Sequence, residues 1–166
     1  MKLPLRRSEK NARVKIDYHI TLQKLAELKN ELTHLEKTTR LKATQEMREM
    51  AKLGDFSENA AYQMAKSRVR RINYRILEIK DFLNCAVVIH PEKNKSSVEL
   101  GHKVTVETNR QQLTYKILGS SETDPSQGVI SHNSPLGSAL MGRKIGEMIK
   151  IKLNNKEIEY KIIGVE

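Results

Sequence analysis

Apolar residues recur at helical spacing through the first half of the chain. Two stretches, 25–35 and 65–83, place them alternately three and four positions apart, and the pattern weakens across 37–40 before resuming with Ala43, Met47 and Met50. This alternation predicts two helices that bury their apolar stripes against each other. The stripes consist of Leu25, Leu28, Leu32, Leu35 and of Ala65, Val69, Ile72, Ile76, Ile79, Leu83.

A glycine marks the point where the first helix is expected to end. Residues 21–53 and 57–84 contain neither Gly nor Pro, whereas Gly54 lies between them. A lone glycine between two helix-forming stretches predicts a helix stop and a turn. We therefore expect an antiparallel helical hairpin with its tip at 54–59, and Thr21 and Ser57 as the N-caps of its two helices.

The second half changes to the pattern of a small strand-rich domain. Pro91 blocks further helix, and Ser134 followed by Pro135 predicts one short capped helix. We predict an α+β protein with a basic N-terminal extension at 1–20, a coiled-coil hairpin at 21–86 and an antiparallel β-rich domain at 87–166. The expected strands are 86–89, 103–108, 113–118, 128–131, 148–153 and 157–165, with a turn at 154–155.

Charge points to a polyanionic partner. The formal net charge is +10, and residues 1–89 carry most of it, with 19 Lys and Arg against 11 Asp and Glu. A concentrated basic excess favours nucleic acid, although solubility alone would also explain it. Neither a secretory signal nor an apolar run of membrane-spanning length is present, so we expect a cytoplasmic protein. The single Cys85 cannot form an internal disulfide, and we expect it to be a buried thiol.

Two acidic residues at the predicted tip are candidates for metal chemistry. Asp55 and Glu58 are three positions apart, so their side chains can point to one side of a helix start. Two carboxylates are too few to hold Mg²⁺ alone, but they could complete a site whose other ligands come from another molecule. The alternative is that they only cap the helix and interact with its dipole.

Basic residues follow one face of the second helix. Arg68, Arg71 and Arg75 are spaced three and four apart, and no acidic residue occurs between Glu58 and Glu78. Such a stripe is suited to gripping phosphates, with Lys66 adding charge and Tyr62 able to stack on a base. An ordinary solvated helix face is the alternative. The five histidines are scattered without metal-ligand spacing in the sequence, and no motif of a self-sufficient enzyme is present.

Two separated motifs resemble those of the Gre family of bacterial transcript-cleavage factors. The first is Gly54-Asp55-Phe56-Ser57-Glu58-Asn59-Ala60-Ala61-Tyr62, and the second contains Ile130-Ser131, Ser134-Pro135-Leu136, Ala139-Leu140 and Gly142. The resemblance extends from about residue 20 to the end. Ala61 departs from it, since Gre factors commonly have an acidic residue there.

The resemblance implies an accessory factor rather than an enzyme. A Gre-type coiled coil enters the secondary channel of RNA polymerase, and its tip acids, here Asp55 and Glu58, help the polymerase aspartates to hold Mg²⁺ for cleavage of backtracked RNA. The FKBP-like second domain docks at the channel rim. It further implies a monomer with RNA contacts near the 3′ end by Tyr62, Lys66, Arg68, Arg71 and Arg75, and docking by Ser134, Pro135, Leu136, Ala139, Leu140 and Gly142.

The basic residues of the second helix resemble the GreB type more than the GreA type, and the GreB type removes longer RNA fragments. Three alternatives stay open at this point: an inhibitory Gre-like channel blocker, a coiled-coil module that binds DNA or RNA without polymerase, and an FKBP-like prolyl isomerase. The intact Asp55 and Glu58 pair argues against the blocker, and the scarcity of aromatic residues argues against an isomerase pocket.

Overall fold

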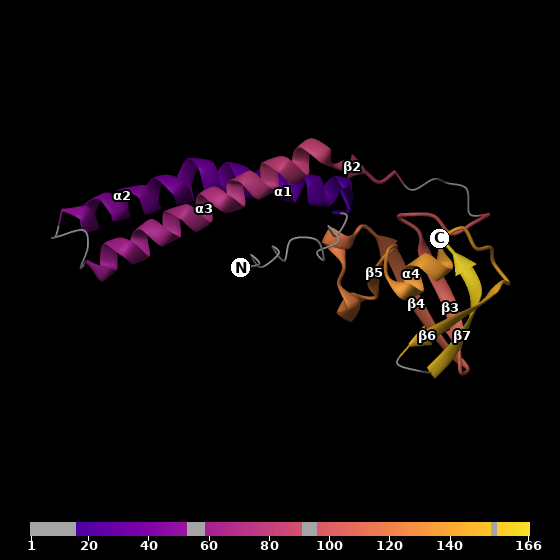
Figure 1. Cartoon of the computed structure of the whole chain (residues 1–166). Coiled ribbons are helices and arrows are strands. Elements are labelled where there is room, and N and C mark those ends of the chain that lie inside the picture. The colour runs from indigo at the N-terminus through magenta and orange to yellow at the C-terminus, as the bar shows by residue number, and fades with distance from the viewer. Residues whose placement is uncertain (1–15, 53–58, 91–95, 154–155) are drawn as a thin grey trace, which may run out of the picture.

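The first half of the chain forms a long helical hairpin (Figure 1). The computed structural model describes residues 16–52, 59–90, 96–153 and 156–166. One arm consists of α1 (Leu22–His34), a π-helical turn η1 (Leu35–Thr39) and α2 (Arg40–Ala51), and the other is α3 (Ala60–Cys85). The arms run antiparallel, as the two apolar stripes predict.

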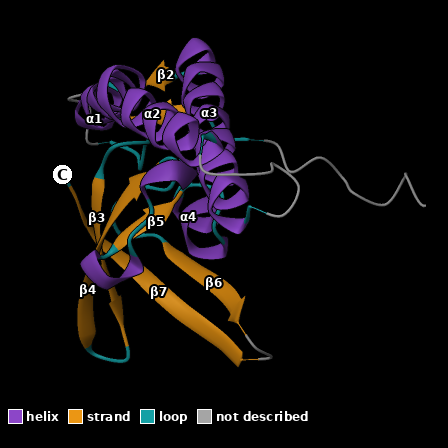
Figure 2. Cartoon of the chain, turned by 90° about the vertical axis from the view of Figure 1, so that its left-hand side faces the viewer, coloured by secondary structure: helices purple, strands orange, loops and turns teal. Residues whose placement is uncertain are grey.

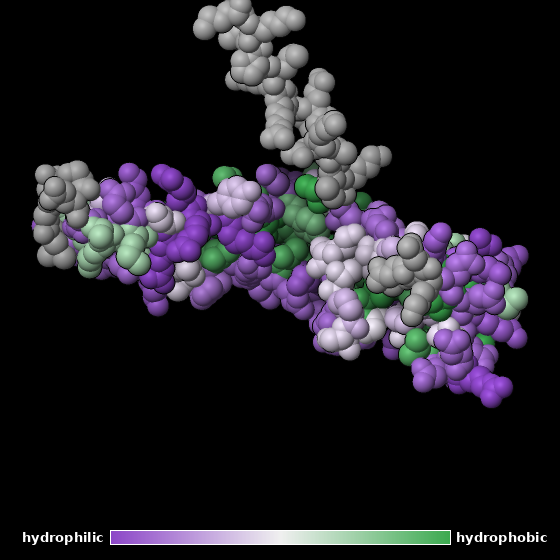
Figure 3. Space-filling view, turned by 60° about the horizontal axis from the view of Figure 1, so that its bottom comes forward, coloured by the Kyte–Doolittle hydropathy of each residue, from purple (hydrophilic) through white to green (hydrophobic). Residues whose placement is uncertain are grey.

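The predicted apolar stripes form the contact between the two arms. Ala43 of α2 is buried with Ile72 and Ile76 of α3, and Leu35 packs against this cluster. Ala65 and Ile79 extend the buried stripe toward the two ends of α3. The outward faces carry mainly hydrophilic side chains, which Figure 3 shows along the visible side of the hairpin. The hairpin is therefore held by a narrow apolar contact.

The π-helical turn lies where the apolar pattern weakens in the sequence. Leu35 and Ala43 both belong to the contact between the arms, although eight positions separate them instead of the regular seven. A π-turn closes i→i+5 hydrogen bonds and thus accommodates one extra residue within a continuous helix. The turn at Leu35–Thr39 therefore keeps both residues on the same face of the arm.

Both arms begin with a side-chain cap. The Thr21 hydroxyl accepts a hydrogen bond from the Lys24 N–H, which confirms the predicted N-cap of α1. The prediction of Ser57 as the second cap is wrong, because α3 begins at Ala60 and Asn59 caps it. An asparagine satisfies the free N–H groups of the first turn as well as a serine does, so composition could not separate the two candidates.

The second half is a curled five-stranded sheet with one short helix (Figure 2). Its spatial order is β5-β4-β3-β7-β6, and α4 (Pro135–Leu140) lies where the sequence places it. The sheet is mixed, because β4 and β5 pair in parallel after a crossover through the 3-10 turns η2 (Ser120–Glu122) and η3 (Pro125–Gln127). The strands are β3 (Lys103–Thr108), β4 (Gln111–Leu118), β5 (Val129–Ser131), β6 (Met148–Leu153) and β7 (Lys156–Val165).

One compact apolar core holds this β domain together. Period-two alternation along the strands brings their inward residues to one face, where α4 adds Leu140. The ends of the β3–β4 and β6–β7 hairpins point away from the helices (Figures 1 and 2). The buried members are Val98, Val104, Val106, Ile117, Leu140, Ile149, Ile151, Ile162 and Val165.

A short parallel pair joins the hairpin to the β domain. Strands β1 (His19–Ile20) and β2 (Val87–Val88) pair just outside the two helix ends, and Ile20 is fully buried. The extension predicted for 1–20 thus includes residues 16–20, which belong to this joint, whereas 1–15 lie outside the described residues. The prediction of a buried Cys85 is wrong, because the end of α3 leaves the thiol exposed. None of the described helices has the length and hydrophobicity that a bilayer span requires.

Candidate functional site

The tip of the hairpin is the first candidate site. Asp55 and Glu58 fall on 53–58, outside the described residues, but the helix ends on either side are described: Lys52 follows α2 and Asn59 precedes α3. Helix α3 has 26 residues, so at ~1.5 Å per residue its first turn lies about 39 Å from its base. The end of α2 and the start of α3 therefore lie at the end of the hairpin remote from the β domain (Figure 1).

Asn59 forms hydrogen bonds to both helices of the hairpin, at the end of α2 and at the start of α3. Its side-chain oxygen accepts a hydrogen bond from the Tyr62 N–H at 3.0 Å, which caps α3. Its amide nitrogen donates to the Met50 carbonyl at 2.8 Å, which satisfies a free carbonyl in the last turn of α2. One side chain thus ties the end of α2 to the start of α3. The sequence offered Asn59 only as part of a motif, and the cross-arm bond could not be foreseen.

Asn59→Ala is expected to lower the free energy of unfolding of the hairpin. Losing a cap costs about 1 kcal/mol, and the second hydrogen bond adds about 1 kcal/mol. Urea unfolding followed by circular dichroism measures the difference. Asn73→Ala removes an exposed asparagine in the middle of α3 and should be neutral or slightly stabilising. Equal stabilities of the two variants would show that Asn59 does not hold the tip.

The predicted basic stripe on α3 is partly neutralised by the opposite arm. Arg68 forms an ion pair with Glu46 at 2.8 Å. Arg75 binds both carboxylate oxygens of Glu31, at 2.9 and 3.1 Å, and this hydrogen bonding raises the pKa of Arg75. Two of the three arginines therefore grip carboxylates in this structure. The sequence of α3 alone could not show this, because the acidic partners come from the other arm.

Of the remaining predicted RNA-binding residues, two are exposed and Tyr62 is half-buried. Arg71 and Lys66 are exposed, and the Lys66 ammonium lies 5.9 Å from the centre of the Tyr62 ring. This is within the range of a cation–π contact. Tyr62 and Lys66 follow Asn59 directly in the first turns of α3, so they lie beside the tip. The basic charge that stays available thus concentrates at Arg71 and toward the tip.

The predicted docking segment is mainly a structural unit. Ser134 caps α4, accepting from the Gly137 N–H and donating to the Ser131 carbonyl. Leu140 is fully buried, so it anchors α4 in the core and could shape a docking surface only through the position of that helix. Leu136 and Ala139 are half-buried against that core. Of the six predicted residues, Pro135 and Gly142 are the exposed ones.

A second cluster lies at the joint between the hairpin and the β domain, and the sequence did not predict it. Asp17 accepts a 2.7 Å hydrogen bond from the Ser120 N–H and bonds of 3.1 and 2.8 Å from the backbone and ring of His19. Thr21 donates its N–H and its hydroxyl to the Glu122 carboxylate, at 2.6 and 2.7 Å. These bonds link segments about a hundred positions apart, so no local pattern could reveal them.

Asp17 makes this joint sensitive to acid. Burial by itself would raise the pKa of Asp17, but the hydrogen bonds from Ser120 and His19 outweigh it and lower the pKa from 3.8 to about 2. A pKa that is lower in the folded state stabilises the fold above the unfolded value, and this stabilisation is lost as pH falls toward the folded value. The difference corresponds to about 2 kcal/mol.

Asp17→Asn should therefore lower the free energy of unfolding by about 2 kcal/mol at pH 7, and the difference from wild type should shrink as pH falls below 4. Urea titrations at pH 7 and pH 2.5, with a chelator present, measure both values. Asp81→Asn changes an exposed aspartate on α3 and serves as the control. A wild-type advantage that persisted unchanged at pH 2.5 would contradict the assignment to ionised Asp17.

Comparisons with known proteins identify transcription elongation factor domains in both halves of the chain. Residues 18–88 match the family model "Transcription elongation factor, N-terminal", and residues 93–166 match "Transcription elongation factor, GreA/GreB, C-term". Transcription elongation factor GreA of Acholeplasma laidlawii is 37% identical over 152 residues, which are 89% of this chain and 96% of that protein. GreA of Macrococcus caseolyticus is 35% identical, over 90% of this chain and 96% of its own.

A solved structure gives a weaker match. GreA factor homolog 1 (Gfh1) of Thermus thermophilus is 22% identical with a TM-score of 0.41, over 90% of this chain and 99% of that one. The reported relatives carry the GreA name, whereas the C-terminal family model describes GreA and GreB together. The predicted leaning toward the GreB type therefore stays a prediction.

Proposed function

Because the chain belongs to the GreA/GreB family of transcription elongation factors, we propose that it stimulates RNA polymerase to cleave backtracked RNA. The hairpin enters the secondary channel of the polymerase, and Asp55 and Glu58 reach the active centre. The β domain docks at the rim of the channel. The factor acts as a monomer in the cytoplasm and is not a nuclease by itself.

The reach of the hairpin, together with the position of the acidic motif in the sequence, carries this proposal. Asp55 and Glu58 belong to the segment between α2 and α3, the first turn of α3 lies about 39 Å from its base, and Asn59 ties the two helix ends together there. A helix cap alone would need no such reach. Two carboxylates delivered on a narrow rod suit a site that is completed inside another molecule.

The chemistry follows from an incomplete ligand set. Two metal ions at a phosphodiester activate the attacking water and stabilise the leaving oxygen. Asp55 and Glu58 would supply the carboxylates that the polymerase aspartates lack for the second Mg²⁺, and they would orient the water for attack. The free factor holds no Mg²⁺ stably, since its two acids leave most of the six coordination positions to water.

In this proposal, side chains close to the tip make the contacts to the RNA. The exposed Arg71 and Lys66 would contact phosphates, and the half-buried Tyr62 would stack on a base near the 3′ end. Arg68 and Arg75 would first have to leave Glu46 and Glu31. Exposed ion pairs of this kind contribute less than about 1 kcal/mol each, so phosphates can compete for both arginines.

The test is a cleavage assay on a stalled, backtracked elongation complex with Mg²⁺, in which the released 3′ RNA fragment is followed over time. The proposal expects faster cleavage with the factor than with polymerase alone. Binding to polymerase without faster cleavage would identify a channel blocker instead. Tight binding to RNA or DNA without polymerase, and no effect on the complex, would identify a nucleic-acid module.

A further inference from the structure

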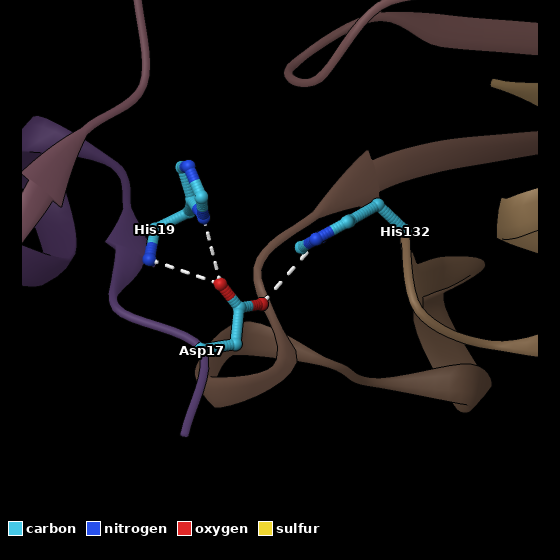
Figure 4. A group of neighbouring side chains, drawn as sticks. All are labelled: Asp17, His19 and His132. Atoms are coloured by element: carbon cyan, nitrogen blue, oxygen red, sulfur yellow. Dashed lines mark hydrogen bonds and ion pairs between the residues drawn. The ribbon is translucent and has the colours of Figure 1, made fainter. Parts of the chain in front are cut away.

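Three side chains of metal-ligand type gather at the joint between the hairpin and the β domain (Figure 4). Asp17 lies between two histidines, with Oδ1 2.8 Å from the Nδ1 of His19 and Oδ2 3.5 Å from the Nδ1 of His132. The potential ligand atoms of all three residues lie within 4.8 Å of one another. The two imidazole rings are edge to face, with centres 5.5 Å apart.

The fold brings these residues together from both parts of the molecule. Asp17 and His19 are two apart on the extended segment that ends in β1, so both side chains can face the β domain. His132 comes directly after β5, where its N–H donates to the Leu118 carbonyl at 3.0 Å. The backbone of His19 is thus held in a strand and that of His132 by a hydrogen bond. The cluster is a consequence of the joint and has no counterpart in the sequence spacing.

We propose that Asp17, His19 and His132 form a binding site for a divalent transition-metal ion of the Zn²⁺ type. Two imidazole nitrogens and one carboxylate oxygen are a donor set that Zn²⁺ uses in proteins, with a water molecule in the fourth position. Tetrahedral ligation at about 2.0–2.1 Å separates neighbouring donors by roughly 3.4 Å. The Asp17–His19 and Asp17–His132 separations lie on either side of this value. Mg²⁺ and Ca²⁺ prefer oxygen ligands and fit less well.

Hydrogen bonds already fix the orientation of the Asp17 carboxylate, as a metal ligand requires. The Asp17 side chain is only 5% exposed, and both its oxygens accept backbone hydrogen bonds, Oδ2 from Ser120 and Oδ1 from His19. Such outer hydrogen bonds orient metal ligands and leave lone pairs for the ion.

The exposed His19 gives a metal ion access to the cluster from solvent. The His19 side chain is 43% exposed, so an ion can reach the cluster from solvent and keep a water ligand there. Without metal, the His19 Nδ1–H donates to the Asp17 carboxylate. For Nδ1 to bind the ion, His19 would adopt its Nε2–H tautomer, with the proton exchanged through solvent and no net loss from the neutral ring. Small rotations of the two rings would then close the donor triangle. Because His132 belongs to the β domain, the bound ion would clamp that domain to the base of the hairpin.

Metal titration of the full chain tests this site. Isothermal calorimetry with Zn²⁺ should show one saturable equivalent, and Co²⁺ should give the visible absorption bands of a low-coordinate nitrogen and oxygen site. His19→Gln and His132→Gln should each weaken binding at least tenfold. Zn²⁺ should raise the melting temperature of wild type but of neither variant, because an ion that binds only the folded state stabilises it.

Two controls separate this cluster from other ligands. His34→Gln with His90→Gln removes two exposed histidines outside the cluster and should leave binding unchanged. Asp55→Asn with Glu58→Gln removes the tip acids and should also leave it unchanged. No saturable ion in wild type, or equal weakening by the control pair, would overturn the proposal and leave a hydrogen-bonded cluster only. The wild-type titration decides the question even if a cluster variant fails to fold.

Discussion

Asp55→Asn or Glu58→Gln is expected to abolish stimulated RNA cleavage while leaving the binding of the factor to polymerase almost unchanged. Each substitution removes a negative charge but keeps the size of the side chain. Loss of one positioned group at a reacting centre costs about 100-fold or more in rate. Polymerase binding depends mainly on the β domain and the sides of the hairpin in our proposal, so it should change little.

The measurement compares the rate of fragment release with the affinity for the elongation complex in the same preparation. Glu49→Gln is a matched control, because Glu49 is an exposed acid of α2 close to the tip whose only described partner is Lys52, at 3.1 Å. It should cleave like wild type. Normal cleavage by Asp55→Asn or by Glu58→Gln would remove that residue from the proposed metal site. Loss of binding together with cleavage would show that the tip acids serve docking instead.

Gly119→Ala is expected to break the joint between the hairpin and the β domain. A Cβ at this position would lie 1.9 Å from the His19 carbonyl oxygen and 2.9 Å from its carbonyl carbon. Both are backbone atoms of the β1 segment, so no side-chain rotation can relieve the clash. Either this segment or the end of β4 must move, and the bonds of Asp17 to Ser120 and of Thr21 to Glu122 are then lost.

The free energy of unfolding should fall by about 3 kcal/mol or more, at the upper end of the cost of overpacking. Urea unfolding measures the loss, and limited proteolysis should show earlier cleavage near residues 16–20. Gly164→Ala is the matched control, because its Cβ would meet only the Thr105 side chain at an ordinary 3.7 Å. Stabilities of the two variants within about 0.5 kcal/mol of each other would mean that the joint accommodates the methyl group.

Regular local patterns predicted most of the fold. The alternating apolar residues of α3 predicted the contact that Ile72 and Ile76 make, and the Ser134-Pro135 pair predicted the start of α4. Five of the six expected strands coincide with those of the curled sheet to within two residues, and the sixth shortens to β2. These signals succeed because helix and strand periods place the apolar side chains of one element on one face.

Features that depend on two distant segments could not be predicted in this way. The charge stripe of α3 looked free because Glu46 and Glu31 lie on the other arm. The histidines looked scattered because His132 meets Asp17 only in the folded chain. The family motif assigns Asp55 and Glu58 from the sequence alone, and this assignment stays a prediction because both residues lie outside the described part of the chain.

The π-turn at Leu35–Thr39 also sets the rotation of α2 about its axis relative to α1. An α-helix advances about 100° per residue, so one extra residue without the turn would rotate α2 by that angle about its axis. The apolar face of α2 would then no longer line up with that of α1, and the far end of the hairpin would be rotated about the hairpin axis. Insertion or deletion of one residue within this turn should therefore rotate α2 relative to α1.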